Sequence, residues 1–248
     1  MTRSKESGVP ESLPRPSSIT APAEPGLSQL PEILRRSLNK QPKTRRGQRT
    51  RINILESARF VFARDGYSAT RISDITKAAD VALGTFYGYF DDKTEVFGAV
   101  VEPVYQLLYR AARSPYLDSQ STSEVLRQSL RDYMVVYYEH RDIMRVLMEA
   151  TTVDERFATV SFEVRSHFVS RIRRNLERAQ EAGLAEPMHP LLEGSALGGM
   201  VESFCWTWFA MGGEREGGSP VLDEVAFDDM VDVLTRLWTR AVFGPQEG

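Results

Sequence analysis

Basic side chains near residue 45 are the groups in this sequence best suited to bind the phosphates of a nucleic acid. The segment KTRRGQRTR, residues 43–51, contains no acidic residue, and clustered Lys and Arg neutralise phosphate charge. Taken alone, such a cluster is more typical of the solvated start of a helix. Phosphate binding becomes the favoured interpretation because of the pattern that follows it. The basic members are Lys43, Arg45, Arg46, Arg49 and Arg51.

Two short helical patterns joined by a tight turn lie within residues 67–93. Asp80 stands where the chain must turn, and Asp tolerates the left-handed backbone conformation better than most non-glycine residues. A second helix is predicted over residues 82–90. This arrangement is typical of a DNA-binding helix-turn-helix. The first pattern places apolar residues at helical spacing near two candidate N-caps: Ile72, Ile75, Ala79, Thr70 and Ser73.

The second helix has one apolar face and one face of small and polar residues. At about 100° per residue, Phe86 and Phe90 fall on one stripe with Leu83 beside them, which predicts packing against the first helix. The opposite face is expected to enter the major groove, because glycines allow the backbone to approach closely. That face comprises Gly84, Thr85, Tyr87, Gly88 and Tyr89.

These residues resemble the tetracycline-repressor-like (TetR) family of transcriptional regulators. The family's helix-turn-helix typically ends in G-T-x-Y-x-x-F followed by a lysine, and the similarity covers residues 50–97, including FARDGY at 62–67. The resemblance implies an all-α fold. An N-terminal three-helix DNA-binding domain would be joined by a fourth helix to a larger helical domain that binds a ligand and dimerises. The matching letters are Gly84, Thr85, Tyr87, Phe90 and Lys93.

Three positions depart from the family pattern and affect the expected mode of DNA recognition. Ala82 stands where a capping Ser or Thr is usual, Leu83 where a polar or basic residue is common, and Gly88 where a larger side chain often contacts DNA. We therefore expect specificity to depend partly on DNA shape. The predicted DNA contacts are Arg45, Arg46, Arg49, Thr70, Arg71, Leu83, Gly84, Thr85, Tyr87, Gly88, Tyr89 and Lys93.

Charge and composition divide the chain. Its net charge is −3, yet residues 43–95 hold ten Lys or Arg and seven acids, whereas residues 96–248 hold fifteen Arg, no Lys and twenty-three acids. This asymmetry favours a DNA-binding domain at 43–92 and a separate helical domain at 93–244. Residues 1–42 contain seven of the thirteen prolines and seven serines. They are predicted to be a disordered tail, and Arg35, Arg36 and Lys40 could add nonspecific DNA affinity.

Helices are predicted throughout the remainder, with no competing strand pattern. The first should run over residues 48–64 and end at Gly66. Another should begin near Asp91 and Asp92 and kink at Pro103. Ser121 with Glu124 forms a candidate capping box. Further helices are expected at about 121–137, 143–148, 157–182, 191–211 and 227–242, with a loop over 212–220.

The family resemblance implies a homodimer formed through the last two helices. A cluster of small residues within residues 191–211 supports close helix approach, and the final helix offers an apolar face. The alternative is that the same residues pack within one chain. The residues concerned are Gly194, Ser195, Ala196, Gly198 and Gly199, and then Val233, Leu234, Leu237, Trp238 and Ala241.

A ligand cavity is predicted from an excess of aromatic and methionine side chains in the second domain. Residues of this type at helical spacing are often plain core, and we expect that of about half of them. The lining nevertheless predicts an apolar or aromatic ligand, oriented by Tyr hydroxyls, Arg145 or Glu149. The predicted members are Tyr105, Tyr109, Tyr133, Tyr137, Met144, Met148, Phe168, Met200, Phe204 and Trp208.

An enzyme is the weaker interpretation. The three histidines are scattered, and only Glu163 with His167 forms an i, i+4 pair suited to a metal or acid–base site. There is no glycine-rich phosphate loop and no nucleophile elbow. We therefore predict no catalytic residue, no metal and no cofactor. The single cysteine, Cys205, excludes an internal disulfide and is expected to be a buried thiol.

The predicted function is that of a ligand-responsive transcriptional regulator, most simply a repressor that leaves a near-palindromic operator when an apolar ligand binds. An activator or ligand-insensitive DNA-binding protein of the same fold is the first alternative, and a helical ligand carrier or enzyme is the second. No apolar run suits a membrane span or signal peptide, so we expect a cytoplasmic protein. Effector, operator and regulated genes are not encoded in any pattern we recognise.

Overall fold

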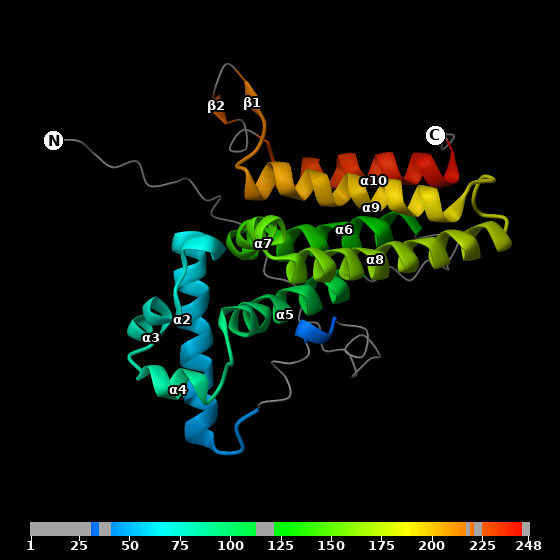
Figure 1. The fold of residues 1–248 in the computed structure, drawn as a ribbon. Helices are drawn as coiled ribbons and strands as arrows, with labels where there is room; N and C mark the ends of the chain where they lie inside the picture. Colours follow the sequence, from blue (N-terminus) through cyan, green and yellow to red (C-terminus); the bar gives the residue numbers. More distant parts are fainter. Residues whose placement is uncertain (1–30, 35–40, 113–121, 217–218, 221–224, 245–248) are drawn as a thin grey trace.

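The computed structural model describes residues 31–34, 41–112, 122–216, 219–220 and 225–244. Within them the chain is almost entirely helical, as predicted. Three helices form a small N-terminal unit and the others form a larger bundle (Figure 1). Their bounds are α2 Arg45–Ala69, α3 Ile72–Ala78, α4 Leu83–Tyr87, α5 Lys93–Ala111, α6 Thr122–Glu139, α7 Arg141–Val153, α8 Glu155–Glu181, α9 Pro190–Cys205 and α10 Phe227–Phe243.

Helix α2 begins three residues earlier than predicted because Thr44 caps it, with its hydroxyl accepting a hydrogen bond from the Gly47 N–H at 3.1 Å. Gly66 breaks the helix as expected, with φ 80° and ψ 173° inside the helical range. The fully buried side chains of its inward face are Ile54, Ala58, Val61 and Phe62.

Helices α3 and α4 form the predicted helix-turn-helix. Asp80 has φ 51°, which confirms the left-handed turn between them. The capping prediction was wrong for Thr70: its hydroxyl donates to the Gly66 carbonyl at 2.6 Å, and Arg71 at the N-cap makes no side-chain cap. Helix α4 is also shorter than predicted, at five residues. Ala82 at the N-cap has no side chain that can cap the helix, and Gly88 at the C-cap has a low helix propensity.

Helix α5 links the two domains and has a reciprocal cap. The Asp92 carboxylate accepts from the Glu95 N–H at 2.7 Å, and the Glu95 carboxylate accepts from the Asp91 N–H at 2.5 Å. The helix continues through Pro103 to Ala111, and the predicted kink there stays a prediction.

A short N-terminal segment, residues 31–34, packs against α5, which corrects the prediction of a uniformly disordered tail. Leu34 is fully buried, and a Cβ placed on Gly98 would lie 3.3 Å from the Ile33 carbonyl oxygen. An apolar leucine therefore anchors this segment to the core. Tail residues 1–30 and 35–40, including Arg35, Arg36 and Lys40, lie outside the described residues, as do the loop at 113–121 and the Ser121 cap.

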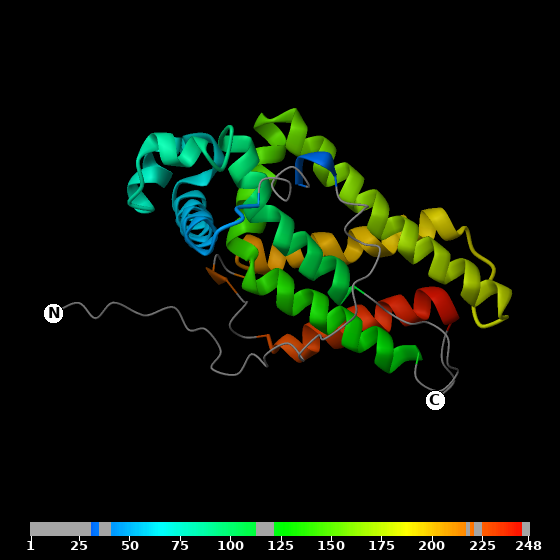
Figure 2. The same ribbon diagram turned by 90° about the horizontal axis from the view of Figure 1, so that it is seen from below.

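The second domain stacks α8 along α9 and places α10 against α6, and Figure 2 shows these long helices from below. Helix α9 is followed by a π-helical turn, Trp206–Ala210, where one continuous helix was predicted. The expected strand-free loop also contains a two-residue antiparallel pair, β1 Arg215–Glu216 with β2 Ser219–Pro220. Both irregularities lie close in sequence to Gly212 and Gly213, which adopt positive φ.

Candidate DNA-binding surface and ligand cavity

Helix α4 presents the face that sequence periodicity predicted. Phe86 and Phe90 are completely buried, which confirms the core face. Leu83 is 51% exposed and Tyr87 is 50% exposed, so Leu83 does not pack inward beside the phenylalanines as expected. It lies instead on the solvent face with Gly84, Thr85 and Gly88.

The two glycines of α4 differ in what surrounds them. A Cβ on Gly84 would meet no atom within 4 Å, whereas one on Gly88 would lie 3.2 Å from the Thr85 carbonyl oxygen. Packing within the chain therefore does not require glycine at position 84. Tyr89 is half-buried, and its hydroxyl would lie 3.6 Å from a Cβ on Gly47, near the start of α2.

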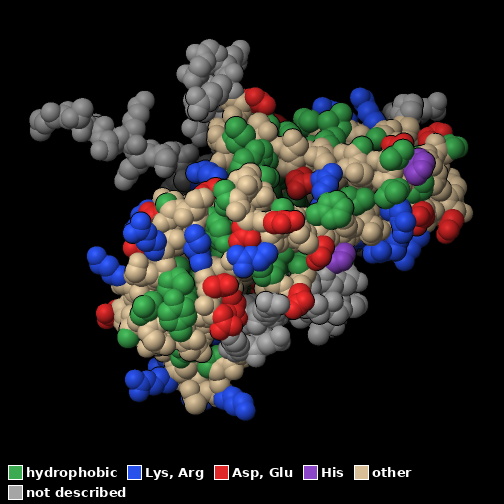
Figure 3. All heavy atoms as spheres, in the orientation of Figure 1, with side chains coloured by type: hydrophobic (Ala, Val, Ile, Leu, Met, Phe, Trp, Pro, Cys, Tyr) green, Lys and Arg blue, Asp and Glu red, His purple; other side chains and the backbone are tan. Residues whose placement is uncertain are grey.

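The basic cluster at the start of α2 lies at the same end of the domain as α4, where Figure 3 shows Lys and Arg side chains on the surface. Arg45, Arg46 and Arg49 are exposed, as is Arg71 at the start of α3. Arg51 differs because its guanidinium lies over the Phe90 ring, 5.3 Å from the centroid. Burial lowers its pKa, and the charges of Glu102 and Glu95 partly offset that effect.

Two predicted phosphate ligands have partners within the chain. The Thr70 side chain is 2% exposed and bonded to the Gly66 carbonyl, so it is not available to DNA. The Lys93 ammonium donates to the carbonyls of Tyr67 at 2.8 Å and Ser68 at 3.4 Å, and it lies 4.5 Å from the centroid of the Tyr67 ring. Lys93 therefore binds the carbonyls that follow the break in α2, and its contact with phosphate stays a prediction.

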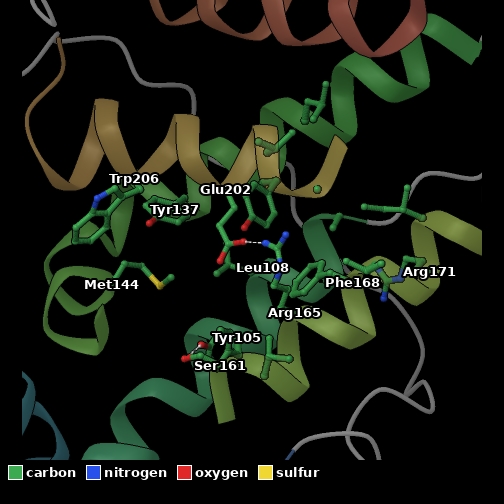
Figure 4. A pocket seen from close by; sticks show the side chains of 18 of the residues that line it. Tyr105, Leu108, Tyr137, Met144, Ser161, Arg165, Phe168, Arg171, Glu202 and Trp206 are labelled. Carbon is green, nitrogen blue, oxygen red and sulfur yellow. Dashed lines mark hydrogen bonds and ion pairs between the residues drawn. The ribbon is translucent and has the colours of Figure 1, made fainter. Parts of the chain in front are cut away.

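A cavity of about 420 Å³ lies in the second domain. Helices α5, α6, α7, α8 and α9 contribute most of its lining, together with Trp206 (Figure 4). Six of the predicted residues line it: Tyr105, Tyr133, Tyr137, Met144, Met148 and Phe168.

Four predicted lining residues lie elsewhere. Helix α9 turns Gly198, Val201 and Glu202 toward the cavity, so Met200 and Phe204, one to three positions away, point elsewhere. The Trp208 ring stacks on Phe204 at 5.7 Å, outside the lining. Tyr109 packs its ring 5.6 Å from Phe168 and 3.5 Å beneath the Arg171 guanidinium, and it does not line the cavity.

Charged side chains also line the cavity, and the prediction from aromatic and methionine residues did not include them. Arg165 on α8 forms an ion pair with Glu202 on α9, and both line the cavity. A signal existed, because Glu202 is the only charged residue between Glu193 and Glu214.

Burial raises the pKa values of the cavity phenols above an ordinary value at which they are already protonated at physiological pH. It raises the pKa of Tyr105 to about 12, and it raises the pKa values of Tyr133 and Tyr137 further above their ordinary range. The negative charge of Glu202 adds to the increase in all three pKa values. Burial likewise raises the pKa of the Cys205 thiol, which is completely buried. Phenols and thiol are therefore neutral groups at physiological pH.

Arg145 and Glu149, predicted to orient the ligand, do not line the cavity. Arg145 donates to the Ala210 carbonyl at 3.0 Å. Glu149 reaches the DNA-binding domain, where its carboxylate accepts from the N–H groups of Tyr67 at 3.0 Å and Ser68 at 2.9 Å. Burial alone would raise the pKa of Glu149, but these hydrogen bonds lower it overall.

The carboxylate of Glu149 explains the glycine at the break in α2. A Cβ on Gly66 would lie 2.5 Å from a Glu149 oxygen, and φ of 80° already disfavours a side chain there. Two further polar contacts join the same domains. Arg59 pairs with Asp142 at 2.9 Å, and the Tyr67 hydroxyl donates to Asp154 at 2.8 Å.

Two of the small residues of α9 pack against α8 within the chain, which is the alternative use of this cluster. A Cβ on Gly194 would lie 3.3 Å from the Arg173 nitrogen, and one on Gly198 would lie 3.2 Å from Ile172, both on α8. In α10, Leu234 and Trp238 are buried in the chain as well. Exposed apolar residues of α9 and α10 include Leu191 at 47%, Leu192 at 63% and Leu237 at 47%, together with Ala196 and Ala241.

Among the described residues, no helix is long and apolar enough to cross a membrane. The same residues contain no group of three or more His, Cys, Asp or Glu that could hold a metal ion.

A helix-turn-helix domain joined by one helix to a larger helical domain with an internal cavity defines a class of DNA-binding transcriptional regulators. Sequence comparison gives the family. Residues 54–100 match the bacterial regulatory proteins of the tetR family, and residues 119–236 match the C-terminal domain of tetracyclin repressor-like proteins. The chain belongs to the TetR family.

Individual relatives are distant. The chain is 29% identical over 126 residues to the probable regulator YttP of Bacillus subtilis, covering 49% of this chain and 58% of that protein. It is 27% identical over 145 residues to the repressor NicS of Pseudomonas putida, covering 57% of this chain and 68% of that one. The matched segment thus spans less than two thirds of YttP.

Solved structures share the fold. The SmeT–triclosan complex aligns with a TM-score of 0.62 at 21% identity, over 81% of this chain and 99% of that one. A TetR-family regulator from Rhodococcus sp. aligns with a TM-score of 0.62 at 18% identity, over 78% of this chain and 98% of that one.

Proposed function

We propose that this chain is a cytoplasmic repressor that binds a near-palindromic operator as a homodimer and leaves it when an apolar or aromatic ligand fills the cavity. The main support for the proposal is that helix α7 contacts both the cavity and the DNA-binding domain. Met144 and Met148 of this helix line the cavity, and the next residue, Glu149, holds the DNA-binding domain. A ligand that displaces α7 therefore acts directly on the position of that domain. No catalytic step is part of the proposal.

The DNA-binding domain, residues 43–92, would place α4 in the major groove. The open space around Gly84 supports close backbone approach to DNA, and the exposed Thr85 and Tyr87 can contact bases or phosphates. Arg45, Arg46, Arg49 and Arg71 would bind phosphates. Few side chains of α4 can form bidentate base contacts, so we keep the expectation that DNA shape contributes to specificity.

The dimer would form through α9 and α10, which lie at the top of Figure 1, on the side of the second domain away from α4. Leu192 and Ala196 of α9, and Leu237 and Ala241 of α10, form exposed apolar rows at i, i+4 spacing. Such faces are commonly buried by a second copy in two-fold dimers. The two recognition helices would then meet major grooves about 34 Å apart, or further apart in a wider dimer.

The ligand-binding domain, residues 93–244, would transmit the ligand signal by two routes. Tyr105 and Leu108 line the cavity from α5, which continues directly from the DNA-binding domain. Helix α7 provides the second route through Glu149, Asp142 and their partners in α2. Ligand response requires unequal affinity of the ligand for the two positions of these helices. The SmeT neighbour in complex with triclosan supports an aromatic ligand for this fold.

Operator binding can be tested by fluorescence anisotropy with the DNA that flanks the protein's own gene and a scrambled duplex, across a salt series. We expect a preference for the native duplex that weakens steeply with salt. Arg46→Ala should weaken binding to both duplexes and reduce the salt dependence, whereas Arg174→Ala, an exposed arginine on α8, should change neither. Equal binding of wild type and Arg46→Ala would contradict the proposed docking.

A further inference from the structure

Glu202 occupies an unusual position for a carboxylate. It lies on α9 as the only charged residue in a stretch of twenty, 194–213, and its side chain points into a cavity walled by aromatic rings (Figure 4). The neighbouring lining includes Tyr137, Trp206 and Phe168. The group that pairs with this carboxylate in the cavity therefore bears on which kind of ligand the cavity can bind.

Arg165 supplies the positive charge that Glu202 faces in the structure. It reaches across from α8, and a Cβ on Gly199 would lie 3.2 Å from its guanidinium, so Gly199 leaves room for it. The side chains are 38% and 49% exposed. A pair with this much solvent contact contributes little net stability and is readily exchanged for another partner.

The two members of this pair differ in what they can do when separated. Arg165 also donates to the Ser195 carbonyl at 3.5 Å, outside the cavity lining. Within the described chain, Arg165 is the sole hydrogen-bonding or ion-pair partner of Glu202. On separation, therefore, the guanidinium keeps an acceptor on α9 while the carboxylate is left in the cavity.

A second arginine of the lining, Arg171, is held at Tyr109, where it donates to the carbonyl at 2.7 Å and lies 3.5 Å from the ring centroid. The aromatic groups of the lining favour a cation beside the Glu202 carboxylate. The faces of Tyr, Trp and Phe rings carry partial negative charge and attract alkylammonium and guanidinium groups. Tyr133 and Tyr137 form no hydrogen bond with any described residue, although Tyr137 is only 2% exposed. Burial raises the pKa values of these phenols and of Cys205, and the negative charge of Glu202 adds to the increase.

We propose that the effector is an amphipathic organic cation, whose charged centre pairs with Glu202 in place of Arg165 while its apolar body packs among the aromatic rings. This inference rests on the proposed function and specifies its ligand. Because Arg165 bridges α8 and α9, binding of such a cation also removes one polar link between these helices.

Three probes with the same biphenylmethyl body can test the charge preference, since they differ only in carrying a trimethylammonium, a tert-butyl or a sulfonate group. Affinities for the full chain are measured by isothermal titration calorimetry. We expect the cation to bind at least tenfold more tightly than its neutral isostere, and the sulfonate to bind most weakly. Glu202→Gln should remove the advantage of the cation, and Arg165→Gln should increase it severalfold.

Glu193→Gln, on the same helix but outside the cavity lining, is the matched control and should bind all three probes as the wild type does. Circular dichroism establishes that each variant is folded. Tighter binding of the sulfonate, with its loss in Arg165→Gln, would overturn the proposal in favour of an anionic effector. Equal binding of cation and neutral isostere would overturn the charge assignment and leave the ligand-responsive function intact. Failure of all three probes to bind would contradict both the charge assignment and the ligand-responsive function.

Discussion

The DNA-binding domain and the ligand-binding domain use aromatic side chains in different ways. Phe86 of α4 and Phe90, just beyond its end, are fully buried, and the outer face of α4 has few side chains that can read bases. In the second domain, Tyr105, Tyr133 and Tyr137 surround an open volume of about 420 Å³ with a carboxylate in its wall. The first arrangement holds a backbone surface in a fixed position. The second leaves space for a ligand beside the hydroxyls of Tyr133 and Tyr137, which form no hydrogen bond with any described residue.

This difference predicts how each domain should respond to amino-acid substitution. A short recognition helix held by two phenylalanines depends on packing, so a change in its core should abolish DNA binding through loss of structure. The cavity contains polar groups that the fold does not use, so a change there should alter ligand choice while the domain remains folded. Single substitutions can test this contrast, beginning with the largest expected effect.

Phe86→Ala should produce the largest loss. Truncating a fully buried phenylalanine typically costs about 3–5 kcal/mol, and the loss should be concentrated in the DNA-binding domain. Urea unfolding, followed by hydrogen exchange of residues 45–90, is the appropriate measurement. The neighbouring Tyr87→Ala is the control, because half of that side chain is exposed and its removal should leave stability within about 0.5 kcal/mol. Equal losses in the two variants would contradict the assigned faces of α4.

Gly66→Ala should destabilise the junction between the domains by about 2 kcal/mol or more, from backbone strain at positive φ and a clash with Glu149. Gly183→Ala separates these causes, because Gly183 has φ of 67° but open space around its Cβ position. It should cost only about 1 kcal/mol. Chemical denaturation of both variants gives the comparison, and a smaller loss for Gly66→Ala than for Gly183→Ala would remove the role given to the Glu149 contact.

Tyr87→Ala should weaken operator affinity roughly tenfold through loss of one groove contact. Because the fold is unaffected, the change should appear in anisotropy titrations and be absent from thermal unfolding. Tyr89→Phe is a useful companion, since Tyr89 is half-buried and its hydroxyl lies near the start of α2. We expect a smaller effect on affinity in that variant. Unchanged binding in Tyr87→Ala would exclude side-chain readout at this position.

Leu237→Arg should dissociate the proposed dimer by placing a charge on the exposed apolar row of α10, raising the dimer dissociation constant at least about tenfold. Sedimentation velocity over a concentration series measures this constant. Arg236→Ala, at the adjacent exposed position, should have little effect if the row is the interface. A monomeric wild type, or an unchanged Leu237→Arg assembly, would contradict the proposed interface.

The smallest expected effect is a pH dependence at the junction. Hydrogen bonds from Arg156, and a further one from Tyr67, lower the pKa of Asp154 to about 2 against the opposing effect of burial. The folded state therefore gains stability from this group at pH values above its unfolded pKa, and loses it as the pH falls from about 4 toward 2. Solvent screening limits the gain to about 1 kcal/mol. The stability gap between wild type and Asp154→Asn should shrink over that range in urea titrations.

Local pattern was sufficient to predict the DNA-binding domain. Phe86, Phe90 and Asp80 were placed correctly because helical periodicity and turn chemistry act over a few residues. The error at Thr70 concerns a single side chain whose partner comes from elsewhere. Its hydroxyl binds the Gly66 carbonyl, and no periodicity indicates which carbonyls are left free where a helix breaks.

The cavity was predicted only in part because its geometry depends on the rotation of α9 against α8. Aromatic composition located Tyr133, Tyr137 and Phe168, but the same criterion included Met200 and Phe204, which face away. The rotation is set by close contacts of Gly194 and Gly198 with α8, which are tertiary. Glu149 shows the same limit, since its partners lie more than 80 residues earlier in the chain.

We propose that α7 transmits ligand binding in the cavity to the DNA-binding domain. Operator release by a cavity-binding compound can be compared in wild type, in Glu149→Gln and in the control Glu155→Gln. We expect Glu149→Gln to bind the compound as tightly as wild type by calorimetry, but the compound concentration that releases it from the operator should differ at least about fivefold from that of wild type. Release at the wild-type concentration, with cavity binding intact, would contradict the claim.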